Sequence, residues 1–504
     1  MAEHREPTSD EVRPLKKRIP ETPNAMKRSL RTRGMSHDSS TSSALQVQPH
    51  IDGTPITKAK VPRSQITPKK SFRERGPISM RDAYTSANSD RTLKERIMGV
   101  SSKSQAEDTD GAESESSGFG EEKKSKVWGA FDLESMKLEA ENVARVVPGR
   151  IMAVRFLPCL DVRMVVVGNK FGEVGFWNMD AEKEDGDGIY VYHPHPGPIA
   201  GILVQPFSLS KVFTACYDGF VRLMDVEKER FDLLYYSDET IYSVSQRPNE
   251  EKCLFLGEGR GGLTFWDERA GKSSFSWMLH QDRVNTIDFS SSNANIMATS
   301  STEGSACIWD LRRMVADSKK SLKTVHHLKA VHSAYFSPSA SLLATTSLDN
   351  KVGLLSGANY EDVTMIDHHN QTPRWISSFR GIWGWDDSYI FIGNMKKGVD
   401  VIAAAERRGA VATLGSANMS AIPCRLGAHP FKAGMLAAAT SGGQNGFSAS
   451  VAQDPNLPLT GLAIHDFIMQ QNKVRIAGQR KENYKSCQVQ LKNKPGGKEV
   501  ASLF

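Results

Sequence analysis

From about residue 150 onward, the hydrophobic and polar positions of the chain follow one pattern that is repeated several times. Each copy is an alternating apolar run ending in small residues, a turn rich in Asp, Asn and Gly, and a second apolar run closing on Trp-Asp or a substitute. Alternation of apolar and polar residues is typical of strands, so the pattern predicts short strands throughout this region. The closing positions recur every 42 to 47 residues, at Trp177, Met224, Trp266, Trp309, Leu355, Ile402 and Phe447.

A four-stranded sheet repeated every ~40–45 residues is the signature of a WD-repeat β-propeller, in which each sheet is one blade of a ring. We therefore predict an all-β fold, a seven-bladed WD-repeat β-propeller over residues 149–450, followed by a poorly ordered polar tail at 451–504. Because no blade buries its hydrophobic faces alone, functional residues should lie on the faces of the ring.

The N-terminal segment differs in composition from the repeats. Ser, Thr, Pro and Arg are abundant, large apolar side chains are sparse, and a basic part is followed by an acidic part between Glu107 and Glu122. Such a segment cannot offset its ordering entropy, so we predict disorder for residues 1–125. The compact basic run Lys16-Lys17-Arg18 predicts a nuclear-import signal; the alternative is an ordinary solvated basic tail.

Between this segment and the first repeat, one stretch has helical periodicity. The spacing predicts an amphipathic linker helix over residues 126–148, which either packs against the first blade or docks on a partner. The apolar positions recur at steps of three and four residues, at Leu133, Met136, Ala140, Val143 and Val147.

Composition and motifs exclude several function classes. No stretch approaches the ~18–20 apolar residues of a membrane span, and the six cysteines lack metal-ligand spacing and favour a reducing compartment. The glycine-rich run at 257–262 lacks the Lys-Ser/Thr and the following helix of a phosphate loop. We therefore expect no enzyme activity, no cofactor and no metal. Structural roles are expected for the histidines at blade boundaries, His193, His195, His326, His327, His368 and His369.

Basic residues recur in or beside the predicted turns. Lys170 and Lys351 occupy tight turns, and Arg374-Trp375 places a cation beside an aromatic ring. Cations around one face, with an aromatic for stacking, suit a phosphate backbone and an unstacked base, whereas isolated Lys and Arg are most often only solvated. The predicted nucleic-acid face consists of Arg150, Lys170, Arg283, Lys351, Arg374, Trp375 and Arg380.

Two consecutive repeats end in Trp-Asp-x-Arg. The Trp is a packing residue, whereas the Arg emerges where the strand leaves the sheet and can form forked hydrogen bonds with a protein partner. Asp267 and Arg269 in one repeat, and Asp310 and Arg312 in the next, are therefore candidate partner-binding residues.

Six segments are more specific than a general WD repeat: VPGRIMAVRFLP (147–158), GNKFGEVGFWN (168–178), VNTIDF (284–289), IWDLRRM (308–314), VHSAYFSPSASLLATTSLDNKVGLL (331–355) and HHNQTPRWISSFRGIW (368–383). In this combination the chain resembles the WD-repeat damaged-DNA-binding family, in the branch of WD repeat-containing protein 76. It resembles more distantly the small subunit of the UV-damaged-DNA-binding complex.

The resemblance implies roles for particular residues. Arg150, Lys170 and Arg283 match positions that grip DNA phosphates in the UV-damage subunit, whereas residues 370–375 lack its Phe-Gln-His wedge. Arg312, and secondly Arg269, match the motif through which such propellers dock on the large adaptor of a cullin-type ubiquitin ligase.

The resemblance therefore implies a nuclear protein that binds DNA or chromatin in the DNA-damage response and serves as a substrate receptor of that ligase. The alternative is a scaffold propeller that binds histone or other peptides and meets DNA only through partners. After residue 444 the chain lacks the alternating strand and closing Trp of a last repeat, so no partner strand is evident for the edge of that blade.

Overall fold

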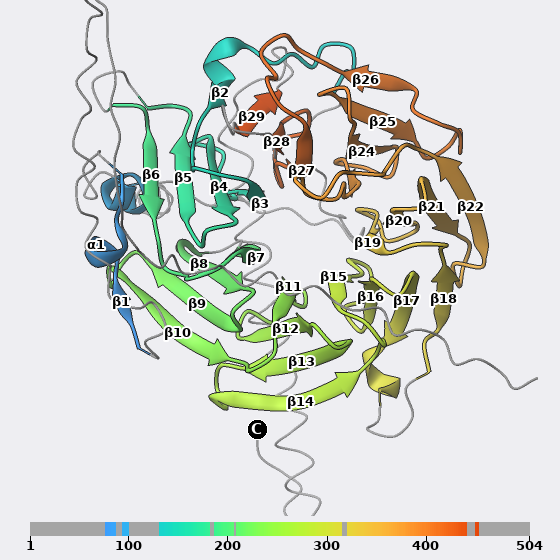
Figure 1. Cartoon of the computed structure of the whole chain (residues 1–504), viewed down its shortest axis with the longest axis horizontal. Coiled ribbons are helices and arrows are strands. Elements are labelled where there is room, and N and C mark those ends of the chain that lie inside the picture. Colours follow the sequence, from blue (N-terminus) through green and yellow to red (C-terminus); the bar gives the residue numbers. More distant parts are fainter. Residues whose placement is uncertain are drawn as a thin grey trace, which may run out of the picture. The chain divides into compact units, whose positions relative to one another are not determined.

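The computed structural model describes residues 76–86, 93–99, 131–181, 186–205, 208–314, 320–440 and 449–452. Antiparallel sheets stand side by side in a ring, with the first strand of each sheet nearest the centre (Figure 1). The all-β WD-repeat propeller predicted from the repeats is confirmed. The import residues Lys16, Lys17 and Arg18 and the tail from 453 onward lie outside the described residues.

Six blades are built from four strands that follow one another along the chain. Blade 1 contains β3 (Ile151–Phe156), β4 (Met164–Asn169), β5 (Val174–Asn178) and β6 (Ile189–Tyr192). Blade 2 contains β7 (Ile199–Gln205), β8 (Ser208–Cys216), β9 (Phe220–Asp225) and β10 (Arg230–Tyr236). Blade 3 contains β11 (Ile241–Ser245), β12 (Cys253–Glu258), β13 (Gly262–Asp267) and β14 (Lys272–Met278).

The other three of these blades have the same order. Blade 4 contains β15 (Val284–Phe289), β16 (Ile296–Ser301), β17 (Ser305–Asp310) and β18 (Lys323–His326). Blade 5 contains β19 (Val331–Phe336), β20 (Leu343–Ser347), β21 (Lys351–Ser356) and β22 (Asp362–Asp367). Blade 6 contains β23 (Ile382–Trp383), β24 (Tyr389–Gly393), β25 (Val399–Ala403) and β26 (Ala412–Leu414).

The place between blade 6 and blade 1 is taken by a composite sheet. It contains β27 (Pro423–Ala428), β28 (Leu436–Thr440) and β29 (Ala449–Ala452), and its outer strand is β2 (Val143–Ala144) from before blade 1. The prediction of seven blades of one kind is thus corrected to six blades of consecutive strands plus this sheet. The strand expected to be lacking after residue 444 is present as β29, although without a closing Trp, and the fourth strand is supplied by β2, which pairs Val143 with Ser450.

Neighbouring blades pack face to face, which explains why their inner strands are apolar or small on both sides. All six residues of β4 are buried, as are all six of β17. Between blades 3 and 4, the core contains Phe255, Phe289 and Trp309. Full burial of such a side chain contributes roughly 1.5–3 kcal/mol, so the interfaces between blades carry most of the stabilisation.

In three blades, a histidine with a buried side chain contacts a threonine of the second strand. In blade 4, His280 Nε2 lies 2.7 Å from Thr299 Oγ1, which also accepts a 2.8 Å hydrogen bond from Trp309 Nε1. His195 contacts Thr214 at 2.8 Å and His327 contacts Thr345 at 2.9 Å in the same way. The structural prediction is confirmed for His195 and His327, whereas His280 was missed. Among the described residues, no group of three or more His, Cys, Asp or Glu is placed to hold a metal.

Part of the segment predicted to be disordered is ordered against blades 1 and 2. Strand β1 (Ile78–Ser79) pairs with β10, and helix α1 (Met80–Ala83) follows it directly. Met80 is 2% exposed, and residues 93–99 form a further helical stretch in which Leu93 is fully buried. The prediction is wrong here because an already folded propeller offers apolar surface that compensates the ordering entropy of a short segment.

The linker helix predicted over 126–148 is also wrong for its described part, 131–148. This part contains a 3-10 turn at Ala140–Asn142 and the strand β2, and no α-helix. Val146 and Val147 are buried against blade 1. The apolar spacing reflects an extended segment that packs across a blade, and a short window cannot distinguish this from a helix.

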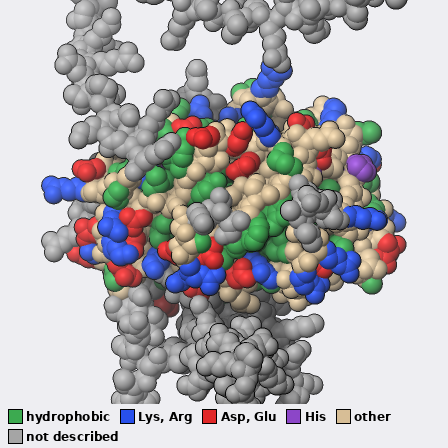
Figure 2. Space-filling model, turned by 90° about the horizontal axis from the view of Figure 1, so that it is seen from below, with side chains coloured by type: hydrophobic (Ala, Val, Ile, Leu, Met, Phe, Trp, Pro, Cys, Tyr) green, Lys and Arg blue, Asp and Glu red, His purple; other side chains and the backbone are tan. Residues whose placement is uncertain are grey.

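The outer surface of the ring, seen from the side of β14, has charged side chains near the lower face and hydrophobic side chains above them (Figure 2). The basic and acidic side chains alternate along this lower edge. Phe275 and Met278 of β14 are 61% and 54% exposed. Within the described residues, no helix has the length and apolar character needed to cross a bilayer.

Candidate nucleic-acid interface

The predicted DNA-binding residues other than Arg380 share one face of the ring. In each blade the first and third strands begin at the same face, because neighbouring strands are antiparallel. We call this the top face and the opposite one the bottom face. Arg150 and Arg283 immediately precede the first strands β3 and β15, Lys170 lies in the turn from β4 to β5, and Lys351 begins the third strand β21. Topology therefore brings to the top face residues that are far apart in the sequence.

In blade 1, a rigid turn presents Lys170. The Lys170 backbone N–H donates to the carbonyl of Arg150 over 2.9 Å, and Asn169 Oδ1 accepts from the N–H of Phe171 and of Glu173, both at 2.9 Å. Gly172 has φ of +92°, and a Cβ there would lie 2.0 Å from the His195 carbonyl oxygen. Only glycine fits this conformation, so the turn is fixed.

An aromatic ring lies beside this lysine. Lys170 Nζ is 4.6 Å from the centroid of the Phe171 ring, and Phe171 is 47% exposed. A solvent-facing ring next to an ammonium group can contact a base or sugar while the lysine binds phosphate. Sequence reasoning named Lys170 but missed Phe171, although the two are adjacent.

Arg283 is held in place by two contacts. Its Nε donates to Thr302 Oγ1 over 2.8 Å, and its guanidinium lies 4.9 Å from the centroid of the Tyr242 ring. Tyr242 in turn packs on Tyr217, with ring centroids 4.8 Å apart. The guanidinium is thereby oriented before any ligand binds, which lowers the entropic cost of a phosphate contact. Both tyrosines were missed from the sequence.

The remaining predicted residues differ in their exposure and in whether their charges are already paired within the protein. Lys351 Nζ forms a 2.6 Å ion pair with Asp367 Oδ1, so its charge is partly neutralised. Arg374 and Trp375 are exposed in the connection from blade 5 to blade 6, and Trp375 is 59% exposed. Arg380 is separate from these: it lies in the central cavity and donates to the Asn285 carbonyl over 3.0 Å.

The two Trp-Asp-x-Arg motifs lie on the bottom face, because their Asp residues end the third strands β13 and β17. Arg312 donates from Nε to Asp310 Oδ1 over 2.9 Å and from its terminal nitrogen to Oδ2 over 2.8 Å. Arg269 grips Asp267 in the same forked manner, at 3.0 and 2.8 Å.

These ion pairs fix both arginines while leaving them accessible. Arg312 and Arg269 are 62% and 68% exposed. The hydrogen bond from Arg312 holds the pKa of the Asp310 carboxyl below its usual range, and Arg269 does the same for Asp267. The structure thus gives two matching acid–base pairs on adjacent blades, each with an exposed arginine on the bottom face.

The ring of four-stranded blades, two of which end in Trp-Asp at Trp266-Asp267 and Trp309-Asp310, defines a WD-repeat propeller protein. In agreement, the family described as WD domain, G-beta repeat matches residues 271–310 and 319–354. The chain is homologous to WD repeat-containing protein 76 and to the fungal DNA damage-binding protein cmr1.

The similarity is confined to part of each protein. WD repeat-containing protein 76 of Xenopus laevis is 28% identical over 274 residues, which cover 53% of this chain and 47% of the relative. The protein of Mus musculus is 23% identical over 274 residues, covering 52% and 43%. DNA damage-binding protein cmr1 of Aspergillus clavatus is 24% identical over 329 residues, covering 56% and 61%. The matched part therefore spans less than two thirds of each of these relatives.

Proposed function

We propose that this protein is a nuclear WD-repeat protein that binds DNA or chromatin through its top face in the DNA-damage response. The observation that carries the proposal is the pair of oriented cations beside aromatic rings: Lys170 with Phe171, and Arg283 with Tyr242. Phosphate contacts position a protein on nucleic acid, and neighbouring rings provide stacking surfaces.

The damage-response part of the proposal is supported by the relatives, of which the fungal ones are named DNA damage-binding proteins. Residues 370–375 offer Arg374 and Trp375 where the UV-damage subunit has a Phe-Gln-His wedge. Trp375 is exposed and lies next to the cation. We therefore propose contact with the duplex at this connection without the wedge insertion seen in that relative.

Salt dependence tests direct DNA contact. With Arg150, Lys170, Arg283 and Arg374 each neutralising one phosphate, the logarithm of affinity should fall with log salt at a slope of about −3.6. Affinity of the full chain for a plain duplex should then decrease about 100-fold between ~50 and ~200 mM salt. Fluorescence anisotropy with plain and UV-irradiated duplexes measures this slope and any damage preference.

The alternative function is a scaffold that binds histone or other peptides. The exposed Phe275 and Met278 on the open outer strand of blade 3 favour this alternative, because a peptide could cover them. Under it, histone-tail binding would be tight and DNA binding of the purified chain absent at ~50 mM salt. That result would contradict the DNA-binding proposal.

We also propose that the bottom face binds the large adaptor of a cullin-type ubiquitin ligase through Arg312 and Arg269, with Asp310 and Asp267 positioning them. Arg312→Ala should weaken capture of the purified adaptor about tenfold, because a forked, charge-assisted contact is lost. Binding of DNA on the opposite face should not change. Arg408→Ala, an exposed arginine in another bottom-face turn, is the matched control. Equal capture by wild type and Arg312→Ala in a surface plasmon resonance titration would remove the adaptor from the proposal.

A further inference from the structure

A cavity of about 390 Å³ lies at the centre of the ring. Its wall is made mainly by the first strands of the blades, including β3, β7, β11, β15, β19 and β27 (Figure 1). The charged side chains that line it are three arginines and one carboxylate: Arg155, Arg380, Arg425 and Asp288. Nothing in the repeat pattern requires three cations at this position, since the other lining residues of the first strands are uncharged apart from Asp288.

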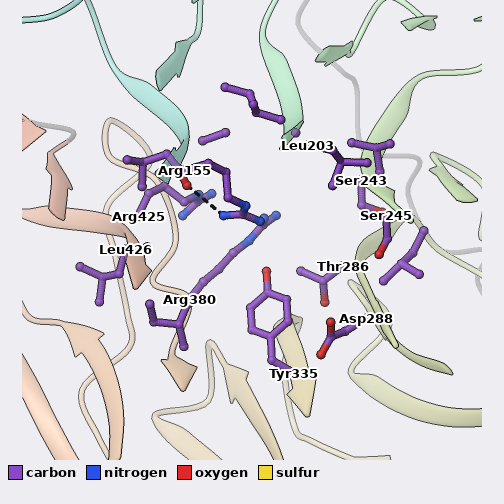
Figure 3. Close-up of a pocket in the computed structure, with 18 of the residues that line it drawn as sticks. Arg155, Leu203, Ser243, Ser245, Thr286, Asp288, Tyr335, Arg380, Arg425 and Leu426 are labelled. Atoms are coloured by element: carbon purple, nitrogen blue, oxygen red, sulfur yellow. Dashed lines mark hydrogen bonds between the residues drawn. The ribbon is translucent and has the colours of Figure 1, made fainter. Parts of the chain in front are cut away.

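The arginines come from different blades and gather on one side of the cavity. Figure 3 shows Arg155, Arg380 and Arg425 on one side, with Ser243, Ser245, Thr286 and Asp288 on the other. Arg425 is anchored: its Nε donates to the Met152 carbonyl over 2.9 Å, and a terminal nitrogen donates to the carbonyls of Ser378 and Cys424. Arg425 is therefore a fixed positive charge in the wall.

Arg380 reaches across the cavity but is not fully satisfied. One terminal nitrogen donates to the Asn285 carbonyl over 3.0 Å, whereas its Nε is buried and has no hydrogen-bond partner among the described residues. His332 Nε2 nearby is buried without such a partner as well. Burial and the charges of Arg380 and Arg425 lower the pKa of His332 to about 3, so this imidazole is neutral. A buried donor without a partner costs free energy. Arg380 lines the cavity, so a bound anion would add a charge-assisted partner for its guanidinium.

Arg155 faces the open part of the cavity. Its side chain is exposed, and the hydrogen bond recorded for it within the described chain joins its terminal nitrogen to the Val154 carbonyl at 2.9 Å. Arg155 lines the cavity, and its exposed guanidinium carries further N–H donors that a ligand can use. Arg155 and Arg380 can therefore act together on one ligand, with Arg425 behind them.

The carboxylate opposite does not cancel this charge. Burial raises the pKa of the Asp288 carboxyl to about 7, even though its Oδ2 accepts a 2.7 Å hydrogen bond from the Phe336 N–H. Near neutral pH this group is partly protonated, while the arginines stay charged. The lining therefore carries a net positive charge of at least two: three arginines less one carboxylate.

We propose that the central cavity binds a small phosphate-type oxyanion with at least two negative charges, held by Arg155 and Arg380 through charge-assisted hydrogen bonds. Guanidinium groups suit this ligand because their donor fork matches two phosphate oxygens. A phosphate group is small compared with about 390 Å³, so a diphosphate or a phosphorylated small molecule fits. This site is separate from the DNA-binding top face and does not depend on it.

Inorganic pyrophosphate is the probe, measured with the full chain by isothermal titration calorimetry at constant ionic strength. We expect binding at one site per chain, weakened about tenfold or more by Arg155→Met and by Arg380→Met. Arg155→Met should disturb the fold less than Arg380→Met, because Arg155 donates a hydrogen bond to the carbonyl of the neighbouring residue Val154 and not to another blade. Arg408→Met, on the exposed turn between β25 and β26, removes the same charge outside the cavity and should bind normally.

Three outcomes overturn the proposal. One is no heat of binding to the folded wild-type chain. Another is equal binding by wild type and by a folded Arg155→Met variant, together with loss of binding in Lys170→Met, which would place the anion on the top face. The third is displacement of bound pyrophosphate by a short DNA duplex, which would show that the cavity takes a backbone phosphate of DNA. The first two results do not depend on whether the DNA-binding proposal holds, whereas the third can occur only if the protein binds DNA.

Discussion

Reversing the charge of Lys170 and Arg283 together is expected to weaken binding of a DNA duplex about 100-fold at ~100 mM salt, or about 2.8 kcal/mol. Two phosphate contacts are lost, and two carboxylates are placed against the backbone. The slope of log affinity against log salt should become less negative by about two, because each contact contributes ~0.9. Fluorescence anisotropy of Lys170→Glu/Arg283→Glu at several salt concentrations measures both quantities.

The control changes net charge by the same amount on the other face. Lys228 and Arg408 are exposed in turns that follow the third strands of blades 2 and 6, so Lys228→Glu/Arg408→Glu alters the bottom face. This variant should bind DNA nearly as wild type does. Equal losses in both variants would indicate a long-range charge effect, and no loss in either would move DNA contact to residues outside the ring.

The second large effect is expected in blade 4, where one hydroxyl serves two buried groups. Thr299 Oγ1 accepts from Trp309 Nε1 and donates to His280 Nε2, because Nδ1 of this imidazole donates to the Glu303 carboxylate, so Thr299→Val leaves both groups without a partner at nearly unchanged side-chain size. Each buried group left without a partner costs ~1–3 kcal/mol, so the free energy of unfolding should fall by about 3 kcal/mol. Urea denaturation followed by tryptophan fluorescence measures this change.

Blade 5 supplies a graded comparison for the same prediction. Thr345 contacts His327 at 2.9 Å, but Leu355 stands where blade 4 has Trp309, so Thr345→Val leaves one buried group without a partner instead of two. About half the loss is expected. Thr372→Val, in the connection between blades 5 and 6, should change stability little. A Thr299→Val protein as stable as Thr372→Val would contradict this account of the network.

The strands could be predicted because each blade repeats a short alternation of apolar and polar residues, which indicates a strand without reference to the rest of the chain. Segments that are ordered only by packing on a distant part of the chain could not be predicted. Met80 is buried only because β10 and its neighbours already exist, and Val143 is a strand residue only because Ser450 pairs with it. Neither contact leaves a periodic signal in the surrounding sequence, so the linker was assigned to a helix and residues 76–99 to disorder.

In the candidate interface, too, local features could be predicted from the sequence and contacts between distant residues could not. Turn position alone indicated that Lys170 and Arg283 share a face, since strand order determines where each turn lies. It could not indicate that Tyr242 of blade 3 lies under Arg283 of blade 4, because their contact crosses between blades. Arg155 and Arg425 were missed for a related reason. Both lie in strands among buried residues, and the sequence of such a strand does not indicate that its basic residue lines a cavity.

The composite sheet also sets an order of events during synthesis. Strand β2 emerges from the ribosome before blade 1, yet its partner β29 ends at Ala452. Blades 1 to 6 can therefore acquire their pairing as the chain is made, whereas β2 must stay unpaired until about 300 more residues have been translated. A nascent or truncated chain that stops before β29 forms an open ring with unpaired strand edges at both ends. Chaperones and proteases recognise chains with such exposed edges.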